Sequence, residues 1–203
     1  MTAAGNRDFG ERFRTAIERF DAENAQDPNV ELYGGQARPR ELVYAQWLTE
    51  WVLRLAPDAS EPLRLAARAQ HICRWLIPRS SYPQTREGYL KWRAELKQLH
   101  ADKAAGILRE VGYPEPTIAR VRDLILKKLL PRDPEAQVLE DALCLVFLEK
   151  QFAALAAKTD HDKIVNALRK SWRKMSLPAR EIALTLKHEP KEKALLEEAL
   201  QGQ

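Results

Sequence analysis

The chain has 203 residues, of which 45% are hydrophobic, and this predicts one globular domain with a sizeable core. Its 33 basic and 29 acidic residues are interleaved, so the net charge of +4 is typical of a solvated surface rather than of a strongly basic nucleic-acid-binding domain. No apolar run approaches the roughly 20 residues that span a bilayer. The N-terminal segment lacks the apolar core of a signal peptide, so we expect a cytoplasmic protein with no membrane partner.

Apolar residues recur at helical spacing along most of the chain. We expect helices over residues 9–24, 42–56, 60–77, 86–111, 117–130, 133–158 and 159–175, and two short helices that begin near residues 176 and 188. Ser60 and Thr85 are good N-cap residues, and prolines and glycines separate the segments. The glycine-containing stretch 27–39 is expected to be a loop. The pattern predicts an all-α protein.

Two of the four histidines lie on apolar helical faces, His71 in LAARAQHICRW and His100 in LKQLHADKAAGIL. Each could be a catalytic residue, a metal ligand or a core residue satisfied by hydrogen bonds. His161 and His188 stand at helix starts and are expected at the surface. The two cysteines are too few for a disulfide framework and are expected to be buried thiols.

Glu140 and Asp141 directly precede the most apolar helical segment of the chain, ALCLVFL. Ionised carboxylates are costly to bury unless they are paired or bind a cation. Adjacent residues of a helix point about 100° apart, so the non-functional alternative is that one carboxylate faces solvent while the other faces the core.

Basic and aromatic residues alternate between Arg74 and Arg93, a stretch with five basic residues and one acid, Glu87. Guanidinium groups bind phosphates in a bidentate manner, and aromatic rings stack on bases or on guanidinium planes. The candidate substrate-binding residues are Arg74, Arg79, Tyr82, Arg86 and Arg93. The alternative is that the aromatic residues are core and the arginines pair with surface acids.

The order of three phrases, LRLAARAQHICRW, HADKAAGILREVGYPEPTIARVRDLILKK and LEDALCLVFLE, resembles the HD-domain superfamily of metal-dependent phosphohydrolases over about residues 40–152. The resemblance implies an orthogonal helical bundle over residues 1–175, with a short C-terminal helical extension, 176–203, packed on it. The matched positions are Tyr44 at the first histidine, Gln70 and His71 at the His-Asp pair, His100 at the next histidine, Lys127 and Lys128 at further histidines, and Asp141 beside Glu140 at the final aspartate. The chain contains no His-Asp dipeptide.

Two other phrases, AQHICRWLIPRSSYP and LEDALCLVFLEKQF, resemble more closely an uncharacterised family that carries only a domain-of-unknown-function label. Its members are sometimes labelled glutamyl-tRNA synthetase. The chain has no signature of a nucleotide-binding α/β domain and no HIGH-like or KMSKS-like motif, so we do not adopt that label.

Three functional hypotheses follow. The first is a metal-dependent phosphohydrolase that acts on a nucleotide or another phosphorylated substrate, with His71, His100 and Asp141 as catalytic residues. A divalent metal (Mn, Fe, Zn or Ni) would be held by these three residues and Glu140, because imidazole and carboxylate suit such ions. The second is a non-catalytic module that binds a nucleotide or RNA through the basic and aromatic segment. The third is a structural protein. The substrate and the oligomeric state are not indicated.

Overall fold

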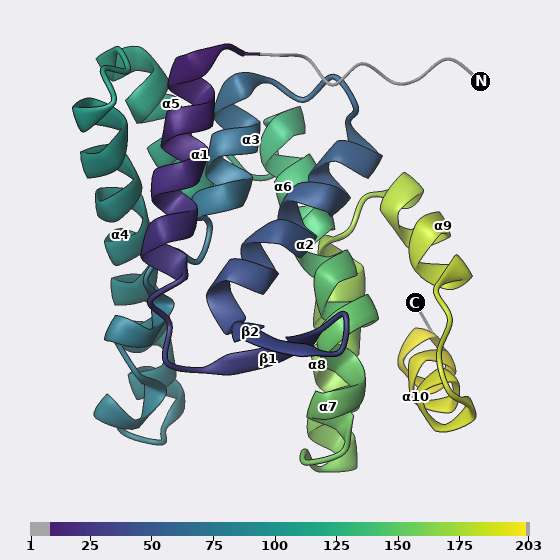
Figure 1. Cartoon of the computed structure of the whole chain (residues 1–203). Coiled ribbons are helices and arrows are strands. Elements are labelled where there is room, and N and C mark those ends of the chain that lie inside the picture. Colours follow the sequence, from purple (N-terminus) through teal and green to yellow (C-terminus); the bar gives the residue numbers. More distant parts are fainter. Residues whose placement is uncertain (1–8, 202–203) are drawn as a thin grey trace. The chain divides into compact units, whose positions relative to one another are not determined.

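The computed structural model describes residues 9–201 (Figure 1). In this part of the chain the protein is all-helical apart from one two-stranded sheet, which confirms the predicted fold class. The chain divides into two compact units, one up to Ala136 and one from Gln137 onward. This division falls earlier than the boundary predicted at residue 175. No helix of the described residues is long and apolar enough to cross a membrane.

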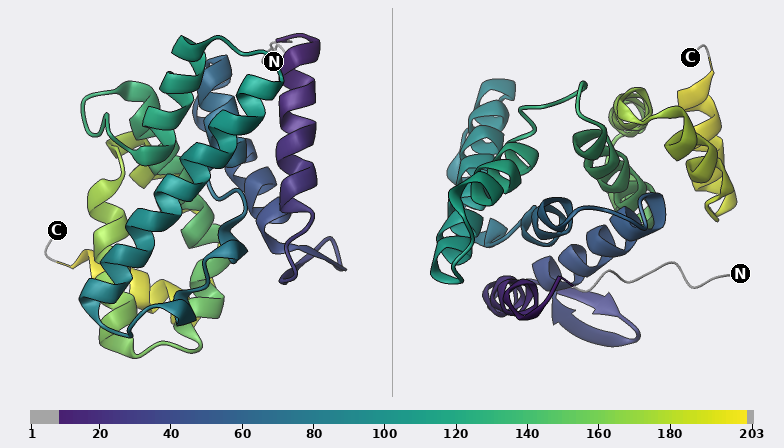
Figure 2. Two further views of the ribbon diagram at one scale, coloured as in Figure 1. Left: turned by 90° about the vertical axis from the view of Figure 1, so that its left-hand side faces the viewer. Right: turned by 90° about the horizontal axis from the view of Figure 1, so that it is seen from above.

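The first unit is built around α3, on which α1, α2, α4 and α5 pack (Figures 1 and 2). The inner helix is mostly buried, in agreement with its alanine-rich sequence. The elements of this unit are α1 (Glu11–Asn24), β1 (Val30–Tyr33), β2 (Gln36–Pro39), α2 (Arg40–Leu55), α3 (Glu61–Ala69), the 3-10 helices η1 (Arg74–Leu76) and η2 (Arg79–Ser81), α4 (Arg86–Glu110) and α5 (Glu115–Leu126).

The two predicted N-caps of this unit are confirmed. Ser60 accepts a hydrogen bond from the backbone N–H of Leu63 at 3.3 Å, and Thr85 accepts one from Gly88 at 3.1 Å. Each bond satisfies a backbone N–H that has no partner inside its own helix. The start of α4 is therefore fixed directly after the loop that carries the arginines.

The stretch predicted as a loop between α1 and α2 instead contains a β-hairpin. Strands β1 and β2 pair antiparallel, with Tyr33 opposite Gln36. Gly34 and Gly35 form the two-residue turn, and both have positive φ angles, 58° and 78°. A Gly-Gly pair between two short strands is a known hairpin signal. The hairpin was not predicted because the two strands are short and their polar and apolar residues do not alternate clearly.

The third helix is shorter than predicted, because it ends at Ala69 and not near Ile77. Cys73 adopts a left-handed conformation with φ of 56°, and its N–H bonds to the side chain of Asn24 at 3.3 Å. The carbonyl of Ile72 is bound by the ring of His100 at 2.7 Å. Partners from other helices thus replace the helical hydrogen bonds of this segment, and a turn carries residues 70–73.

The second unit consists of most of α6 (Pro134–Val146), the π-helical segment η3 (Phe147–Gln151), α7 (Phe152–Ala156), α8 (His161–Lys174), α9 (Leu177–Thr185) and α10 (Pro190–Leu200). Within it, α10 packs on α7 and α8. His161 is exposed as predicted, but the surface prediction for His188 is wrong. The His188 side chain is only 6% exposed and lies edge-on to Phe152, with ring centroids 5.7 Å apart.

Candidate functional site

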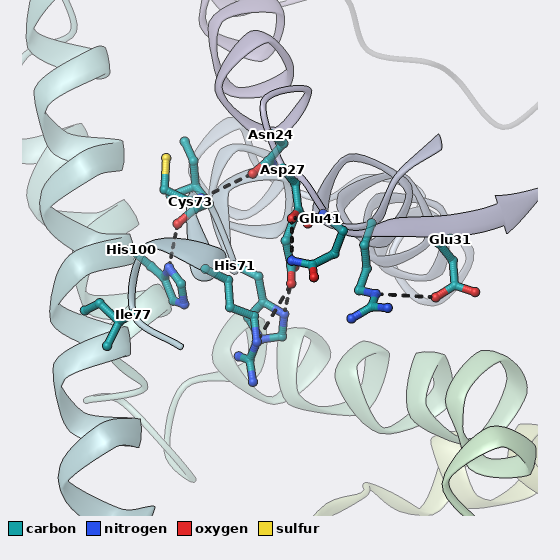
Figure 3. A network of polar contacts seen from close by, with 12 residues as sticks. Asn24, Asp27, Glu31, Glu41, His71, Cys73, Ile77 and His100 are labelled. Carbon is teal, nitrogen blue, oxygen red and sulfur yellow. Dashed lines mark hydrogen bonds and ion pairs between the residues drawn. The ribbon is translucent and has the colours of Figure 1, made fainter. Parts of the chain in front are cut away.

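His71 and His100, which were predicted to share a site, lie together in the first unit (Figure 3). Their ring centroids are 5.6 Å apart. His71 belongs to the turn after α3, and its ring stacks on that of Tyr44 from α2 at 4.4 Å. His100 lies buried in the middle of α4. Three of the positions matched by the resemblance therefore meet in space.

Both imidazole rings are held in the neutral form. Burial lowers the pKa of His100 to about 4, and burial, assisted by the charge of Arg74, lowers the pKa of His71 well below its usual value. Because the carbonyl of Ile72 can only accept a hydrogen bond, Nδ1 of His100 carries the proton. Its Nε2 therefore holds a free lone pair, and this buried atom has no hydrogen-bond partner among the described residues.

Glu41 is a third member of this cluster, and it was missed because a glutamate in the first turn of a helix is common. It is the second residue of α2, one turn before Tyr44, and only 6% of it is exposed. Its Oε2 lies 3.7 Å from Nδ1 of His71 and its Oε1 lies 3.8 Å from Nε of Arg74 (Figure 3). Both distances exceed the roughly 3.2 Å of an N–H···O hydrogen bond.

Asp27 fixes the position of Glu41. The N-cap position of α2 is Pro39, which has no side-chain acceptor. Asp27, from the connection after α1, takes over this role, because its Oδ2 accepts a hydrogen bond from the backbone N–H of Glu41 at 3.0 Å. Its Oδ1 accepts two more from Asn29, at 2.9 Å and 2.8 Å.

The environment of Glu41 makes its carboxyl group titrate near neutral pH. Burial raises the pKa of Glu41 to about 7, attraction to Arg74 offsets part of this rise, and repulsion from Asp27 adds to it. A carboxyl group with such a pKa is present in both protonation states at physiological pH. Groups with this property are frequent at functional sites, where they exchange protons or bind ligands.

A pocket of about 160 Å³ opens beside Glu41, and we call it the arginine pocket. Its charged and aromatic lining residues are Arg40, Glu41, Arg74, Trp75, Arg79 and Trp92. The guanidinium carbons of Arg74 and Arg79 lie 5.0 Å and 5.9 Å from the ring centroid of Trp92. The indole N–H of Trp92 donates to the carbonyl of Ile77 at 2.8 Å and so holds the connecting segment in place.

Only some of the predicted substrate-binding residues lie together. Arg74 and Arg79 meet at the arginine pocket, together with Arg40, which was not predicted. Tyr82 lines a separate pocket, and its hydroxyl donates to the carboxylate of Glu95. Arg86, which is exposed, and Arg93, which lies over the ring of Tyr89, line neither of these two pockets.

Glu140 and Asp141 belong to the second unit, where both are buried and engaged. Asp141 accepts hydrogen bonds from the backbone N–H and the hydroxyl of Ser176, at 2.8 Å and 2.6 Å, and from Gln137 at 2.9 Å. Glu140 forms an ion pair with Lys174 at 3.1 Å. The Asp141 carboxylate thus anchors the residue that caps α9.

Of the four metal ligands predicted from the resemblance, His71 and His100 lie in the first unit and Glu140 and Asp141 in the second. In the part of the chain that the structure describes, no group of three or more histidine, cysteine, aspartate or glutamate side chains is arranged to hold a metal ion. The place of the first ligand is taken by Tyr44, which stacks face-on against His71. This position therefore supplies no imidazole ligand, and the metal centre implied by the resemblance stays a prediction.

Comparisons with known proteins identify a family but not an activity. Residues 14–196 match the family described as Domain of unknown function (DUF4202). No curated protein and no solved structure matches the chain. The likeness to an uncharacterised domain family is thereby confirmed, while the likeness to the HD-domain superfamily stays a prediction. This chain belongs to the DUF4202 family.

Proposed function

We propose that this protein binds a small phosphorylated molecule, with the phosphate held in the arginine pocket by Arg40, Arg74 and Arg79. Planar guanidinium groups offer paired N–H donors that match phosphate oxygens. Arg74 and Arg79 are held beside the ring of Trp92, so less side-chain entropy is lost when a ligand binds. The lining contains three guanidinium groups and one carboxyl group, which favours an anionic ligand.

The observation that carries this proposal is the contrast between these arginines and others of the first unit. Arg68 binds both oxygens of Asp21, at 2.6 Å and 2.5 Å, and Arg120 binds both oxygens of Asp133, at 2.7 Å and 2.9 Å. Each of those arginines is thus held by a protein carboxylate in a bidentate manner.

The arginines of the pocket have weaker partners. Arg74 lies 3.8 Å from Glu41, and Arg40 lies 3.8 Å from Glu31, so neither makes a direct hydrogen bond to a carboxylate there. Arg79 donates to the backbone carbonyls of Tyr82 and Pro83. Three positive charges gathered without hydrogen-bonded acids repel one another, and a bound phosphate would remove that cost.

The volume of the pocket restricts the ligand. Sites for drug-sized ligands usually measure about 300–1,000 Å³, whereas the arginine pocket measures about 160 Å³. It accommodates a phosphate group and a few further atoms. A nucleotide would have to leave its base outside the pocket. The ring of Tyr89, which lies 5.8 Å from that of Trp92, is exposed.

Calorimetric titration of the full chain with inorganic phosphate, glycerol 3-phosphate and adenosine monophosphate tests the proposal. We expect Arg74→Ala to weaken binding at least about ten-fold, because a hydrogen bond to a charged group is lost. Arg122→Ala is the matched control, since Arg122 pairs with Asp102 and lies outside the pocket lining. No binding by the wild type, or equal losses in both variants, would refute the proposal.

RNA is the alternative partner of the basic and aromatic segment between Arg74 and Arg93. The salt dependence of binding distinguishes RNA from a small phosphorylated molecule. Binding of single-stranded RNA releases several counterions, so its affinity falls steeply as salt rises. A single phosphate held by three arginines gives a shallow dependence. Tight binding of an oligonucleotide with a steep salt slope, and no binding of small phosphates, would assign the pocket to RNA.

Hydrolysis of the bound phosphate ester is a second candidate function, favoured by the cluster of Glu41, His71 and His100 beside the pocket. In such a reaction the oxygen of water bonds to phosphorus and one of its protons passes to a basic side chain. The P–O bond to the leaving group breaks, and the leaving oxygen takes up a proton from solvent. Release of inorganic phosphate by the wild type, abolished by His71→Asn, would support it. A metal (Mn, Fe, Zn or Ni) on the two histidines is tested by elemental analysis of protein purified without an affinity tag.

A further inference from the structure

Glu41 is the least expected residue of a phosphate pocket, because a carboxyl group repels an anion. It is nevertheless held there by the hydrogen bond from its own backbone N–H to Asp27 and by its position in the first turn of α2. Its Oε2 is buried and has no hydrogen-bond partner among the described residues. A buried polar atom left without a partner costs free energy, which is tolerated where a ligand supplies the partner.

The nearest protein donors do not satisfy this carboxyl group. Arg74 and His71 lie 3.8 Å and 3.7 Å away, and the neutral ring of His71 offers no positive charge. The terminal torsion of a glutamate has a broad two-fold preference, so either oxygen can turn toward the pocket that the residue lines.

We infer that Glu41 accepts a hydrogen bond from a hydroxyl group of the ligand, so that the pocket selects a phosphorylated polyol or sugar over a plain phosphate ester. This inference rests on the proposed phosphate binding by the arginine pocket. A hydroxyl donor fits better than an ammonium group, because Arg40, Arg74 and Arg79 would repel a second positive charge. When Arg74 turns to the phosphate, the hydroxyl takes its place beside the carboxyl group.

Two ligands with the same carbon count provide the test. Glycerol 3-phosphate carries two hydroxyl groups, and propyl phosphate carries none. We expect the wild type to bind glycerol 3-phosphate at least about ten-fold more tightly, since a hydrogen bond to a charged acceptor distinguishes them. If neither ligand binds, the proposed function itself is refuted. If both bind with equal affinity, phosphate binding stands and the role of Glu41 is refuted.

Glu41→Met sharpens this test because it removes both the acceptor and the negative charge. Glycerol 3-phosphate should then bind more weakly, while propyl phosphate should bind more tightly because the repulsion is gone. Glu31→Gln is the matched control, since Glu31 lies at the same 3.8 Å from a pocket arginine but does not line the pocket. If both affinities rise together in Glu41→Met, Glu41 is only a countercharge of Arg74 and the inference is overturned. Glu41→Gln keeps the shape of the side chain and should give an intermediate preference.

Discussion

Replacement of Glu41 by glutamine should raise the free energy of unfolding above that of the wild type at alkaline pH. At acidic pH the variant and the wild type should be equally stable. Glutamine has the shape of the protonated carboxyl group and cannot ionise. The folded-state pKa of Glu41 is about 7, against 4.5 for an ordinary glutamate. The folded state therefore binds the proton more tightly than the unfolded state, and the wild type loses stability as pH rises from 4.5 through 7.

The size of this stabilisation follows from the shift of the Glu41 pKa. Each unit of pKa corresponds to about 1.4 kcal/mol, so the shift of Glu41 from 4.5 to about 7 corresponds to about 3 kcal/mol of unfolding free energy. Glu41→Gln should match the wild type below about pH 4.5 and exceed it by up to this amount above about pH 8.

Urea denaturation at several pH values measures this difference. Trp47, Trp51, Trp75 and Trp92 lie in the first unit and only Trp172 in the second, so tryptophan fluorescence reports mainly on the unit that contains Glu41. A stability difference that does not change between pH 5 and pH 9 would refute the reasoning, because it would show that Glu41 titrates normally in the folded state.

Protonation of the two histidines changes the stability in the opposite direction to protonation of Glu41. The Glu41→Gln variant is therefore needed to separate the two contributions. The pKa of His100 falls from 6.5 to about 4, so the unfolded state binds the proton more tightly, and stability is lost as pH falls through this range. In the wild type this loss opposes the gain from protonation of Glu41. The Glu41→Gln variant should therefore lose stability more steeply on acidification than the wild type.

Two substitutions and one labelling experiment test the structural roles of single residues. Asp141→Asn should destabilise the protein by about 1–3 kcal/mol in urea denaturation, because Ser176 loses a charged acceptor. Gly88→Ala should cost about 1–3 kcal/mol in the same assay, because the added Cβ would lie 2.3 Å from the backbone oxygen of Pro83. Cys73, whose thiol pKa is raised to about 12 by burial and by the neighbouring Glu23, should resist iodoacetamide at pH 8 by mass spectrometry until the protein unfolds.

Local signals in the sequence account for most of the helices. Ser60 and Thr85 cap α3 and α4 as expected, because each of these two caps bonds within the first turn of its own helix. The errors arise where distant residues decide the backbone. The early end of α3 depends on Asn24 and His100, which lie far away in sequence and bind the backbone of Cys73 and Ile72.

The same limit of sequence-based prediction applies to the candidate site. Apolar flanking residues singled out His71 and His100, and the alternation of arginine and aromatic residues singled out Arg74 and Arg79. Glu41 and Arg40 could not be found in this way, because the burial of Glu41 and the place of both residues in the pocket result from how the hairpin and α2 meet the turn after α3.

The interactions that end α3 are also those that place the site residues. If the helix continued through residues 70–77, Ile72 would bond within the helix and His100 would lose its acceptor for Nδ1. In the turn that replaces the helix, His71 and Arg74 both approach the carboxyl group of Glu41. The cost of interrupting the helix is offset by the bonds from Asn24 of α1 and His100 of α4, which hold the backbone on both sides of the site residues. Substitution of Asn24 by alanine should therefore weaken phosphate binding as well as stability, although Asn24 does not line the pocket.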